Sequence, residues 1–238
     1  MSSNGADPCM AHEFLTRDMK TLHDAIVVGD AVVSRAITEQ KLGKGVEPLA
    51  LVNEAMMPAM AEAGRRFETN EYFVPQLLRS ARAMKTAMAI LRPLLVAGGT
   101  RSLGRVVIGT VAGDVHDIGK HLVAAMLEGA GFEVIDLGTS VSAEQFVLAA
   151  ENYQAQVVGL SALLTTTMYA IKTTIEKMHA SGLRERIKVL IGGAPVTKEF
   201  AREIGADGFS NSASDAVVAA KLVLGIPATR TPGVYVKE

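Results

Sequence analysis

The sequence predicts an α/β protein with an N-terminal four-helix bundle cap and a flavodoxin- or Rossmann-like, doubly wound parallel sheet of five strands. Three observations carry this prediction. Apolar residues recur at helical spacing up to residue 97. A run of small and polar residues, Gly98–Ser102, then interrupts the pattern. Beyond it, short apolar runs alternate strictly with helical segments, which is typical of a parallel sheet covered by helices.

The helices of the first half follow from the spacing of their apolar residues. The first helix is expected from Glu13, with apolar residues at i, i+4, i+7 and i+11 on one face. Asp30 is expected to cap the second helix. Pro48 and Pro75 suit the first turns of the third and fourth helices. Pro58 falls inside the third helix, so a kink or an unsatisfied carbonyl is expected there, because proline has no N–H.

The second half is expected to alternate strands and helices. The predicted strands are 105–110, 133–137, 157–161, 187–191 and a short one near 208–209. One predicted helix begins at residue 120, and the other four span 143–152, 167–180, 197–204 and 214–224. Five such strands suit the order 2-1-3-4-5, in which a crevice opens where strands 1 and 3 separate. The expected boundaries are a leader at 1–12, the helical cap at 13–97, a linker at 98–103, a binding domain at 104–226 and a tail at 227–238.

Composition excludes several functional classes. The net charge is -1 and the pI is near 6.5, so no basic field is present to attract nucleic acid or an anionic membrane. The single cysteine, Cys9, excludes a disulfide framework and fits a reducing compartment. The N-terminus lacks a signal-peptide pattern. The uncharged apolar stretch 157–171 is shorter than the roughly 20 residues that span a membrane. A cytoplasmic location is therefore expected.

The loop after the first predicted strand concentrates chemistry. Asp114, His116 and Asp117 lie within four residues at the place where α/β folds bind ligands. A carboxylate that accepts a proton from one imidazole nitrogen fixes the tautomer and makes the other nitrogen a better metal ligand. The structural alternative is that His116 is solvated or caps the following helix, which is the commoner role of an isolated histidine in such a loop.

The residues near His116 do not complete a protein-only metal site. Zinc takes three or four protein ligands, whereas His121 lies on a helix and Cys9 is distant in sequence. A metal at His116 would therefore bring its other ligands with it, as in a macrocycle. A phosphate-binding loop is excluded because Asp114 and His121 stand where that motif needs glycine and a hydroxyl residue. An aspartyl-phosphate receiver is disfavoured because its second acidic site is missing.

Two further loops follow strand ends and carry open alternatives. The hydroxyl residues between Ser161 and Thr167 either cap a helix or contact a ligand. Gly192 and Gly193 either form a tight turn or let a ligand approach the backbone closely. All three loops are expected at one end of the sheet.

Together these motifs resemble a known family. The three patterns are D-x-H-x-x-G from Asp114 to Gly119, S-x-L from Ser161 to Leu163, and the two glycines at 192–193. Together they resemble the cobalamin-binding signature. The run 113–120 and the helical segment 72–85 are similar to those of cobalamin-dependent methionine synthase. The size and the order of domains resemble the stand-alone corrinoid proteins of methanol, methylamine, glycine betaine and O-demethylase methyltransferase systems. The resemblance covers residues 13–225.

The resemblance implies that the chain binds cobalamin. It implies that His116 is the lower axial ligand to cobalt, held by Asp114 in a relay that ends at Thr167, where the family has serine. Phe73, with Tyr72, would cover the upper face of the cofactor. The other implied cofactor contacts are Gly113, Val115, Asp117, Ile118, Gly119, Ser161, Leu163, Thr165, Gly192, Gly193, Ala194 and Ala213.

The resemblance also implies a function as a methyl carrier that cycles between Co(I) and methyl-Co(III). Its partners would be a substrate-specific corrinoid methyltransferase, a second methyltransferase to a folate or thiol acceptor, and a reductive activase. The chain is expected to be the corrinoid subunit of such a system rather than an enzyme alone, since one cysteine cannot build a three-thiolate zinc centre. The linker would act as a hinge. The alternatives are a cobalamin-dependent sensor, the small subunit of an adenosylcobalamin mutase, and a flavin- or nucleotide-binding domain.

Overall fold

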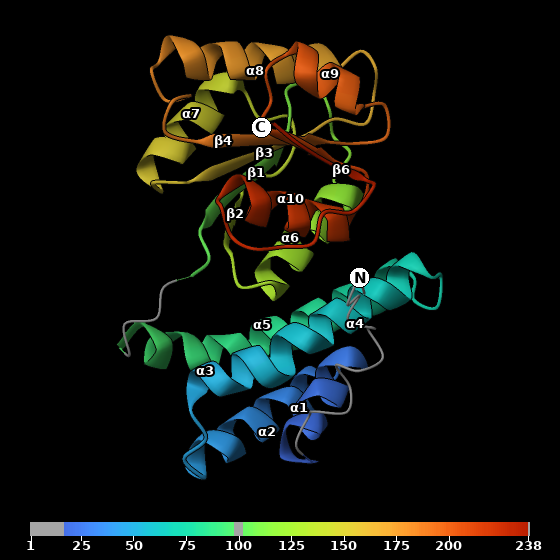
Figure 1. Ribbon diagram of the computed structural model, residues 1–238, viewed down its shortest axis with the longest axis vertical. Helices are drawn as coiled ribbons and strands as arrows, with labels where there is room; N and C mark the ends of the chain where they lie inside the picture. Colours follow the sequence, from blue (N-terminus) through green and yellow to red (C-terminus); the bar gives the residue numbers. More distant parts are fainter. Residues whose placement is uncertain (1–16, 98–101, 238) are drawn as a thin grey trace, which may run out of the picture. The chain divides into compact units, whose positions relative to one another are not determined.

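The computed structural model describes residues 17–97 and 102–237. The chain divides into two compact units, residues 1–100 and residues 101–238 (Figure 1). The expected leader, the first residues of the first helix and linker residues 98–101 lie outside the described residues. Among the helices of the described ranges, none combines the length and the apolar character that a membrane crossing requires.

The first unit contains the four predicted helices, the third of them interrupted. Their bounds are α1 Arg17–Val27, α2 Ala31–Gly43, α3 Pro48–Leu51, the π-helical turn η2 Val52–Met56, α4 Met57–Glu68 and α5 Val74–Ala97. The irregularity expected at Pro58 takes the form of the π turn just before it. The Met57 N–H donates to the Val52 carbonyl five residues back. Such a bulge adjusts the hydrogen-bond register next to a proline that has no N–H to contribute.

The core of this unit is built from long apolar side chains with few aromatics. They are buried because their helical spacing places them on the inward faces of α1, α4, α5 and the α3–η2 segment. The largest fully buried members are Leu22, Ile26, Leu51, Met56, Met60, Leu77, Met84 and Leu91. The methionines therefore serve as packing residues that fill irregular space between helices.

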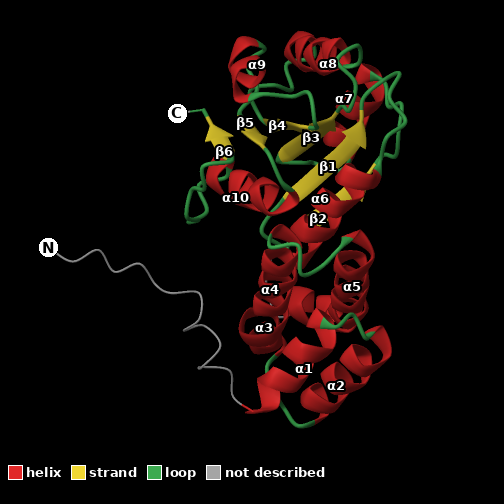
Figure 2. Cartoon of the chain, turned by 90° about the vertical axis from the view of Figure 1, so that its right-hand side faces the viewer, coloured by secondary structure: helices red, strands yellow, loops and turns green. Residues whose placement is uncertain are grey.

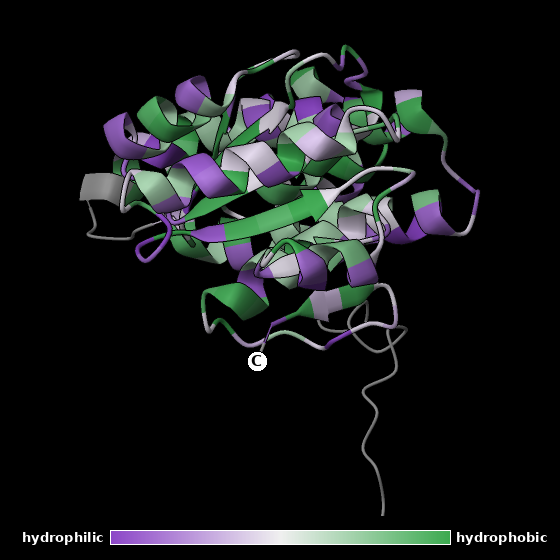
Figure 3. Cartoon of the chain, turned by 90° about the horizontal axis from the view of Figure 1, so that it is seen from above, coloured by the Kyte–Doolittle hydropathy of each residue, from purple (hydrophilic) through white to green (hydrophobic). Residues whose placement is uncertain are grey.

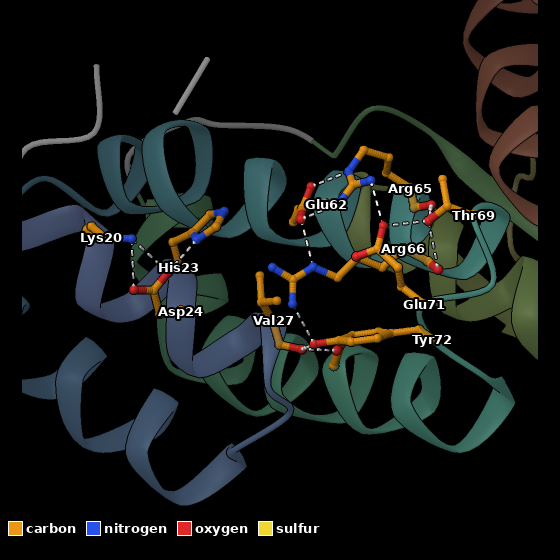
Figure 4. Close-up of polar contacts among 11 residues, drawn as sticks. Lys20, His23, Asp24, Val27, Glu62, Arg65, Arg66, Thr69, Glu71 and Tyr72 are labelled. Carbon is orange, nitrogen blue, oxygen red and sulfur yellow. Dashed lines mark hydrogen bonds and ion pairs between the residues drawn. The ribbon is translucent and has the colours of Figure 1, made fainter. Parts of the chain in front are cut away.

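A polar network holds the loop that joins α4 to α5 (Figure 4). The Tyr72 hydroxyl donates to the Val27 carbonyl at the end of α1 over 3.0 Å, and the Arg66 guanidinium donates to that hydroxyl over 3.2 Å. Arg66 also binds Glu62 over 2.7 Å. Hydrogen bonds from Arg65 outweigh the partial burial of Glu62 and, with those from Arg66, lower the pKa of Glu62 to about 2. The loop is thereby tied to two helices.

Tyr72→Phe is expected to lower the free energy of unfolding by about 0.5–1.5 kcal/mol, the net contribution of one hydrogen bond. The remaining donor to the Val27 carbonyl, the Ser80 hydroxyl at 2.7 Å, limits the loss. Urea unfolding followed by circular dichroism measures the change. Tyr153→Phe is the matched control, because that ring is half exposed. Equal losses in both variants would contradict a structural role for the Tyr72 hydroxyl.

The second unit is built on one sheet (Figure 2). Its strands are β1 Arg105–Thr110, β2 Glu133–Asp136, β3 Val157–Ser161, β4 Lys188–Gly192, β5 Gly208–Ser210 and β6 Val234–Val236. They lie in the order β2-β1-β3-β4-β5-β6. The predicted order of the five parallel strands is confirmed. The strand count needs a correction, because residues 234–236 of the expected tail form a sixth, antiparallel strand on the edge of β5.

Helices cover both faces of this sheet. Their bounds are α6 Ile118–Gly129, α7 Ala143–Asn152, α8 Met168–Ala180, α9 Lys198–Glu203 and α10 Ala213–Val223. Figure 1 shows α6 and α10 on one face and α7, α8 and α9 on the other. Alternate residues of β1 serve the two faces: Val107 packs in the core with α7 and α8, and Val106 in the core with α6 and α10. The strands are accordingly mostly apolar, as their green colour in Figure 3 shows.

Candidate functional site

The three predicted loops leave the sheet side by side. Thr110, Ser161 and Gly192, the last residues of β1, β3 and β4, are aligned in register. Because the strands are parallel, the segments that follow them all emerge at the same edge. The chain crosses from β1 to β2 on one side and reaches β3 on the other, so this edge is the switch point where open α/β sheets bind ligands.

Asp114 is the centre of the site. Its side chain is completely buried. One carboxylate oxygen, Oδ1, accepts from the main-chain N–H of His116 over 3.0 Å and from His116 Nδ1 over 2.8 Å. The other oxygen, Oδ2, accepts from the N–H of Leu163 and from the Thr167 hydroxyl, each over 2.7 Å. The β1 loop is thereby joined to the β3 loop through a single carboxylate.

These donors keep Asp114 ionised. Burial favours the neutral carboxyl group, but the hydrogen bonds from Leu163, His116 and Thr167 outweigh it and hold the pKa of Asp114 far below its ordinary value of 3.8. An ionised carboxylate can only accept, so His116 Nδ1 carries the proton that it shares with Asp114. The lone pair of the imidazole is consequently on Nε2. The side chain of His116 is 46% exposed, so a ligand can approach it.

The third member of the predicted relay, Thr167, lies beside the first two. It is buried, and its hydroxyl is 2.7 Å from Asp114 Oδ2 and 2.9 Å from the Leu164 carbonyl. The single hydroxyl hydrogen is best donated to the charged oxygen, since hydrogen bonds to ions are the stronger ones. Threonine therefore supplies the same hydroxyl contact to Asp114 that a serine would, and the role of that contact stays a prediction.

Five large apolar side chains, in and next to the two loops that Asp114 joins, are exposed to solvent. We call the following five residues the apolar platform: Val115, Ile118, Leu163, Leu164 and Tyr169, which are between 43% and 70% exposed. The first two flank His116 in the chain, the next two carry main-chain N–H groups that point to Asp114, and Tyr169 follows Thr167 by two residues. An exposed apolar cluster of this kind marks a surface that another molecule covers. A flat apolar macrocycle that brings a metal to the imidazole fits this chemistry.

The two glycines at the end of β4 differ in what they require. Gly193 has a φ of +130°, and a Cβ there would lie 1.8 Å from the Ala162 carbonyl oxygen. The backbone of this protein alone therefore demands glycine at 193. At Gly192 the nearest atom to a Cβ is the Ser210 carbonyl oxygen at 3.5 Å, an ordinary contact. A Cβ at Gly119, in the first turn of α6, would meet nothing. These two glycines leave space that a ligand can use.

The remaining predicted contacts of the sheet unit follow strand ends and differ in exposure. Gly113, Thr165 and Ala194 are exposed, Ser161 is half-buried, and Ala213 is buried at the start of α10. The side chain of Asp117 lies 3.6 Å from His121 Nδ1, so it pairs with His121 rather than with His116. Phe73 belongs to the helical unit and is 61% exposed, whereas its neighbour Tyr72 is engaged with Val27.

Sequence reasoning missed part of the site. Leu164 and Tyr169 complete the apolar platform, but their apolar character alone reads as helix or strand packing, so only the exposure in the structure singles them out. It also missed the buried ion pair between Lys120 and Asp136. A lysine in the first turn of a helix is normally solvated, and no pattern in the sequence signals its burial.

Comparisons with known proteins agree with this geometry. Residues 104–221 match the B12 binding domain family, and residues 19–92 match a second B12 binding domain family. Trimethylamine corrinoid protein 1 of Methanosarcina acetivorans is 40% identical over 203 residues, which span 84% of this chain and 94% of that protein. The dimethylamine corrinoid protein of Methanosarcina barkeri is 41% identical over 207 residues, spanning 87% and 97% respectively.

A solved structure shares both units. The methanol:cobalamin methyltransferase complex of Methanosarcina barkeri contains a chain that matches with a TM-score of 0.80 and 26% identity, over 94% of this chain and 86% of that one. The family matches cover the helical unit and the sheet unit, and the residues of the Asp114 site fit a corrinoid. The chain therefore belongs to the corrinoid proteins, which are built from B12 binding domains and use a cobalamin-type cofactor.

Proposed function

We propose that this chain is a methyl carrier that binds cobalamin with His116 as the lower axial ligand and serves two methyltransferases in turn. One observation carries the proposal: Nδ1 of His116 is tied to the buried carboxylate of Asp114, which leaves Nε2 of the half-exposed ring available to a metal. That arrangement has the form of a metal-binding histidine whose orientation is set by a carboxylate behind it.

The residues of the site have separable tasks in this proposal. When bound, the corrinoid supplies a cobalt centre that accepts a methyl group and gives it up again. His116 would hold the metal through Nε2. Asp114 keeps the proton at Nδ1 and would stabilise the charge of the ring if Nε2 took up a second proton. Thr167, Leu163 and the main chain of His116 keep Asp114 charged for that purpose.

The rest of the predicted site is assigned to the cofactor's periphery. The platform would cover the lower face of the ring. Ser161, Thr165, Gly192, Gly193, Ala194 and Ala213 would line the place of the displaced nucleotide tail. Phe73 would shield the upper, methyl-bearing face, as an exposed aromatic on a loop fixed by the Tyr72 network.

The partners are inferred from the chemistry and from the relatives. The relatives bear names of trimethylamine and dimethylamine corrinoid proteins, and the matched structure is of a methanol:cobalamin methyltransferase complex. We therefore assign this chain a substrate-specific methyltransferase that uses a small methylated amine or alcohol. A second methyltransferase would pass the methyl group to a folate or thiol acceptor, and a reductive activase would restore the reduced cobalt.

Histidine ligation is tested by isotopic labelling. The protein is prepared with ¹⁵N-histidine, loaded with hydroxocobalamin and reduced to Co(II). The nitrogen hyperfine pattern in the EPR spectrum is expected to change from triplets to doublets, because the ligating nitrogen belongs to the protein. His116→Ala is expected to lose the ¹⁵N doublets, and His121→Ala, a half-exposed neighbour, to keep them. Doublets that survive in His116→Ala would remove the assignment.

The carrier role is tested separately from cofactor binding. Reduced holoprotein is mixed with methanol, trimethylamine or dimethylamine, with and without a matching corrinoid methyltransferase, and the visible spectrum is followed. Methylation only in the presence of the methyltransferase is expected. Methylation without any partner would contradict the carrier assignment, and tight binding of adenosylcobalamin with radical formation would favour a mutase subunit.

A further inference from the structure

We propose that Thr110 is a positioning residue for His116, holding the main chain of the ligating residue from outside the Asp114 relay. The inference rests on the proposed ligation of cobalt by His116. The Thr110 hydroxyl donates to the His116 carbonyl over 2.9 Å. Asp114 contacts the N–H and the ring of His116 but not its carbonyl. Among the described contacts, the Thr110 hydroxyl is therefore the group that holds the His116 carbonyl.

Thr110 is well suited to act as a fixed anchor. It is the last residue of β1 and is completely buried. Its N–H donates to the Gly138 carbonyl over 3.0 Å, and its own carbonyl accepts from the Val141 N–H over 2.9 Å. A β-branched side chain has few rotamers, so a threonine whose main chain is held on both sides presents its hydroxyl in one direction. The hydroxyl closes the loop from 110 to 116 onto the strand from which it starts.

The neighbouring turn reinforces the same loop. The Ser140 N–H donates to the Asp114 carbonyl over 2.9 Å, and the Gly113 N–H donates to the Ser140 hydroxyl over 3.2 Å. This turn is itself anchored, since the Gly138 N–H donates to Asp136 Oδ1 over 2.9 Å. Asp136 in turn pairs with the buried ammonium of Lys120. The main chain around Asp114 is thus fixed without the Thr110 hydroxyl, which leaves the orientation of His116 as the property that this hydroxyl controls.

The physical consequence concerns ligation rather than cofactor capture. Without the Thr110 hydroxyl, the 116–117 peptide is free to rotate, and the imidazole can pivot about its bond to Asp114. A metal ligand needs its lone pair directed at the metal, so a pivoting ring binds it less often. The apolar platform and the glycine positions are untouched, so the corrinoid is still expected to bind. The ratio of ligated to unligated Co(II) is expected to fall about fivefold, the size of one hydrogen bond.

Thr110→Val tests this with the same ¹⁵N-histidine EPR measurement, made on corrinoid-loaded protein. Thr110→Ser retains the hydroxyl and is expected to restore most of the ligated fraction. Thr174→Val is the matched control, because Thr174 is also buried and its hydroxyl donates to a main-chain carbonyl, that of Ala170, over 2.7 Å. If valine does not fit at this position, Thr110→Ala gives the same comparison without added bulk.

The outcomes separate the two proposals. A reduced ligated fraction in Thr110→Val and Thr110→Ala, with recovery in Thr110→Ser, supports the positioning role. A wild-type fraction in the valine and alanine variants, while His116→Ala loses all coupling, overturns the role of Thr110 and leaves ligation by His116 intact. Absence of histidine coupling in the unmutated protein overturns both.

Discussion

Asp114→Asn is expected to lower the free energy of unfolding at neutral pH by roughly 3–5 kcal/mol, the cost of breaking a buried charged network by changing one member. The carboxylate accepts from three main-chain N–H groups, from the Thr167 hydroxyl and from His116 Nδ1. The side-chain amide of asparagine has one accepting oxygen. Its NH₂ group would therefore face the N–H or O–H donors that bond one of the two carboxylate oxygens in the wild type. The variant would also lose the charge that fixes the His116 tautomer.

The same variant is expected to change how stability depends on pH. The pKa of Asp114 is lower in the folded protein than its ordinary value of 3.8. A group with a depressed folded pKa contributes stability that is fully present above the unfolded pKa and is lost as the pH falls toward the folded pKa. The wild-type protein should therefore lose more stability between neutral pH and the region below 3.8 than Asp114→Asn does.

Urea unfolding of the cofactor-free protein at a series of pH values measures both effects. Asp117→Asn is the matched control, since that carboxylate lies in the same loop, is partly exposed and pairs with His121 over 3.6 Å. Parallel pH profiles for the wild type and Asp114→Asn would show that the carboxylate is not stabilised in the folded state. With cofactor bound, Asp114→Asn is also expected to weaken the histidine coupling seen by EPR.

The sequence was sufficient to predict the parts of this fold that depend on local pattern. The buried strand from Arg105 to Thr110 and the helix from Ala143 to Asn152 were predicted with the observed bounds, because apolar runs and caps are short-range signals. The clustering of Asp114, Ser161 and Gly192 followed from topology, since parallel strands bring their carboxyl ends to one edge. Residues far apart in sequence could thus be placed together without a structure.

What could not be predicted depends on contacts made only after folding. β6 has the strand-forming sequence Val-Tyr-Val, but three residues are too few to show an alternating pattern, and its place in the sheet comes from pairing with β5. The burial of Lys120 depends on Asp136, which the chain delivers from the next strand. At Gly193 the sequence leaves a tight turn and the approach of a ligand as alternatives, and the need for glycine there comes from the Ala162 carbonyl oxygen. In each case the deciding atom lies in another segment, which a local pattern does not report.

The two adjacent glycines at the end of β4 are expected to affect different properties: Gly193 the free energy of unfolding and Gly192 the affinity for the cofactor. Gly193→Ala is expected to lower the free energy of unfolding by more than about 4 kcal/mol, since it combines backbone strain with a steric clash. The added Cβ would lie 1.8 Å from the Ala162 carbonyl oxygen, at a φ of +130° that a residue with a side chain rarely adopts. The end of β4 would have to move away from β3.

Gly192→Ala is the matched variant with the opposite expectation. Its Cβ would meet only the Ser210 carbonyl oxygen at 3.5 Å, so the free energy of unfolding should change by less than about 1 kcal/mol. The methyl group would instead occupy space assigned to the nucleotide tail of cobalamin. Its affinity for cobalamin should therefore fall, while its affinity for cobinamide, which lacks that tail, should not.

Urea unfolding of the cofactor-free variants and spectroscopic titration with the two corrinoids measure these expectations. A Gly192→Ala protein that binds cobalamin as tightly as the wild type would show that the tail does not pass this residue. A stable Gly193→Ala protein would show that the β3 and β4 loops can separate at little cost. If Gly192→Ala keeps its fold and loses affinity for cobalamin alone, the tail lies at the edge that Thr110, Ser161 and Gly192 share. The two corrinoids differ in that tail, so a loss confined to cobalamin reports a contact between the tail and the added methyl group.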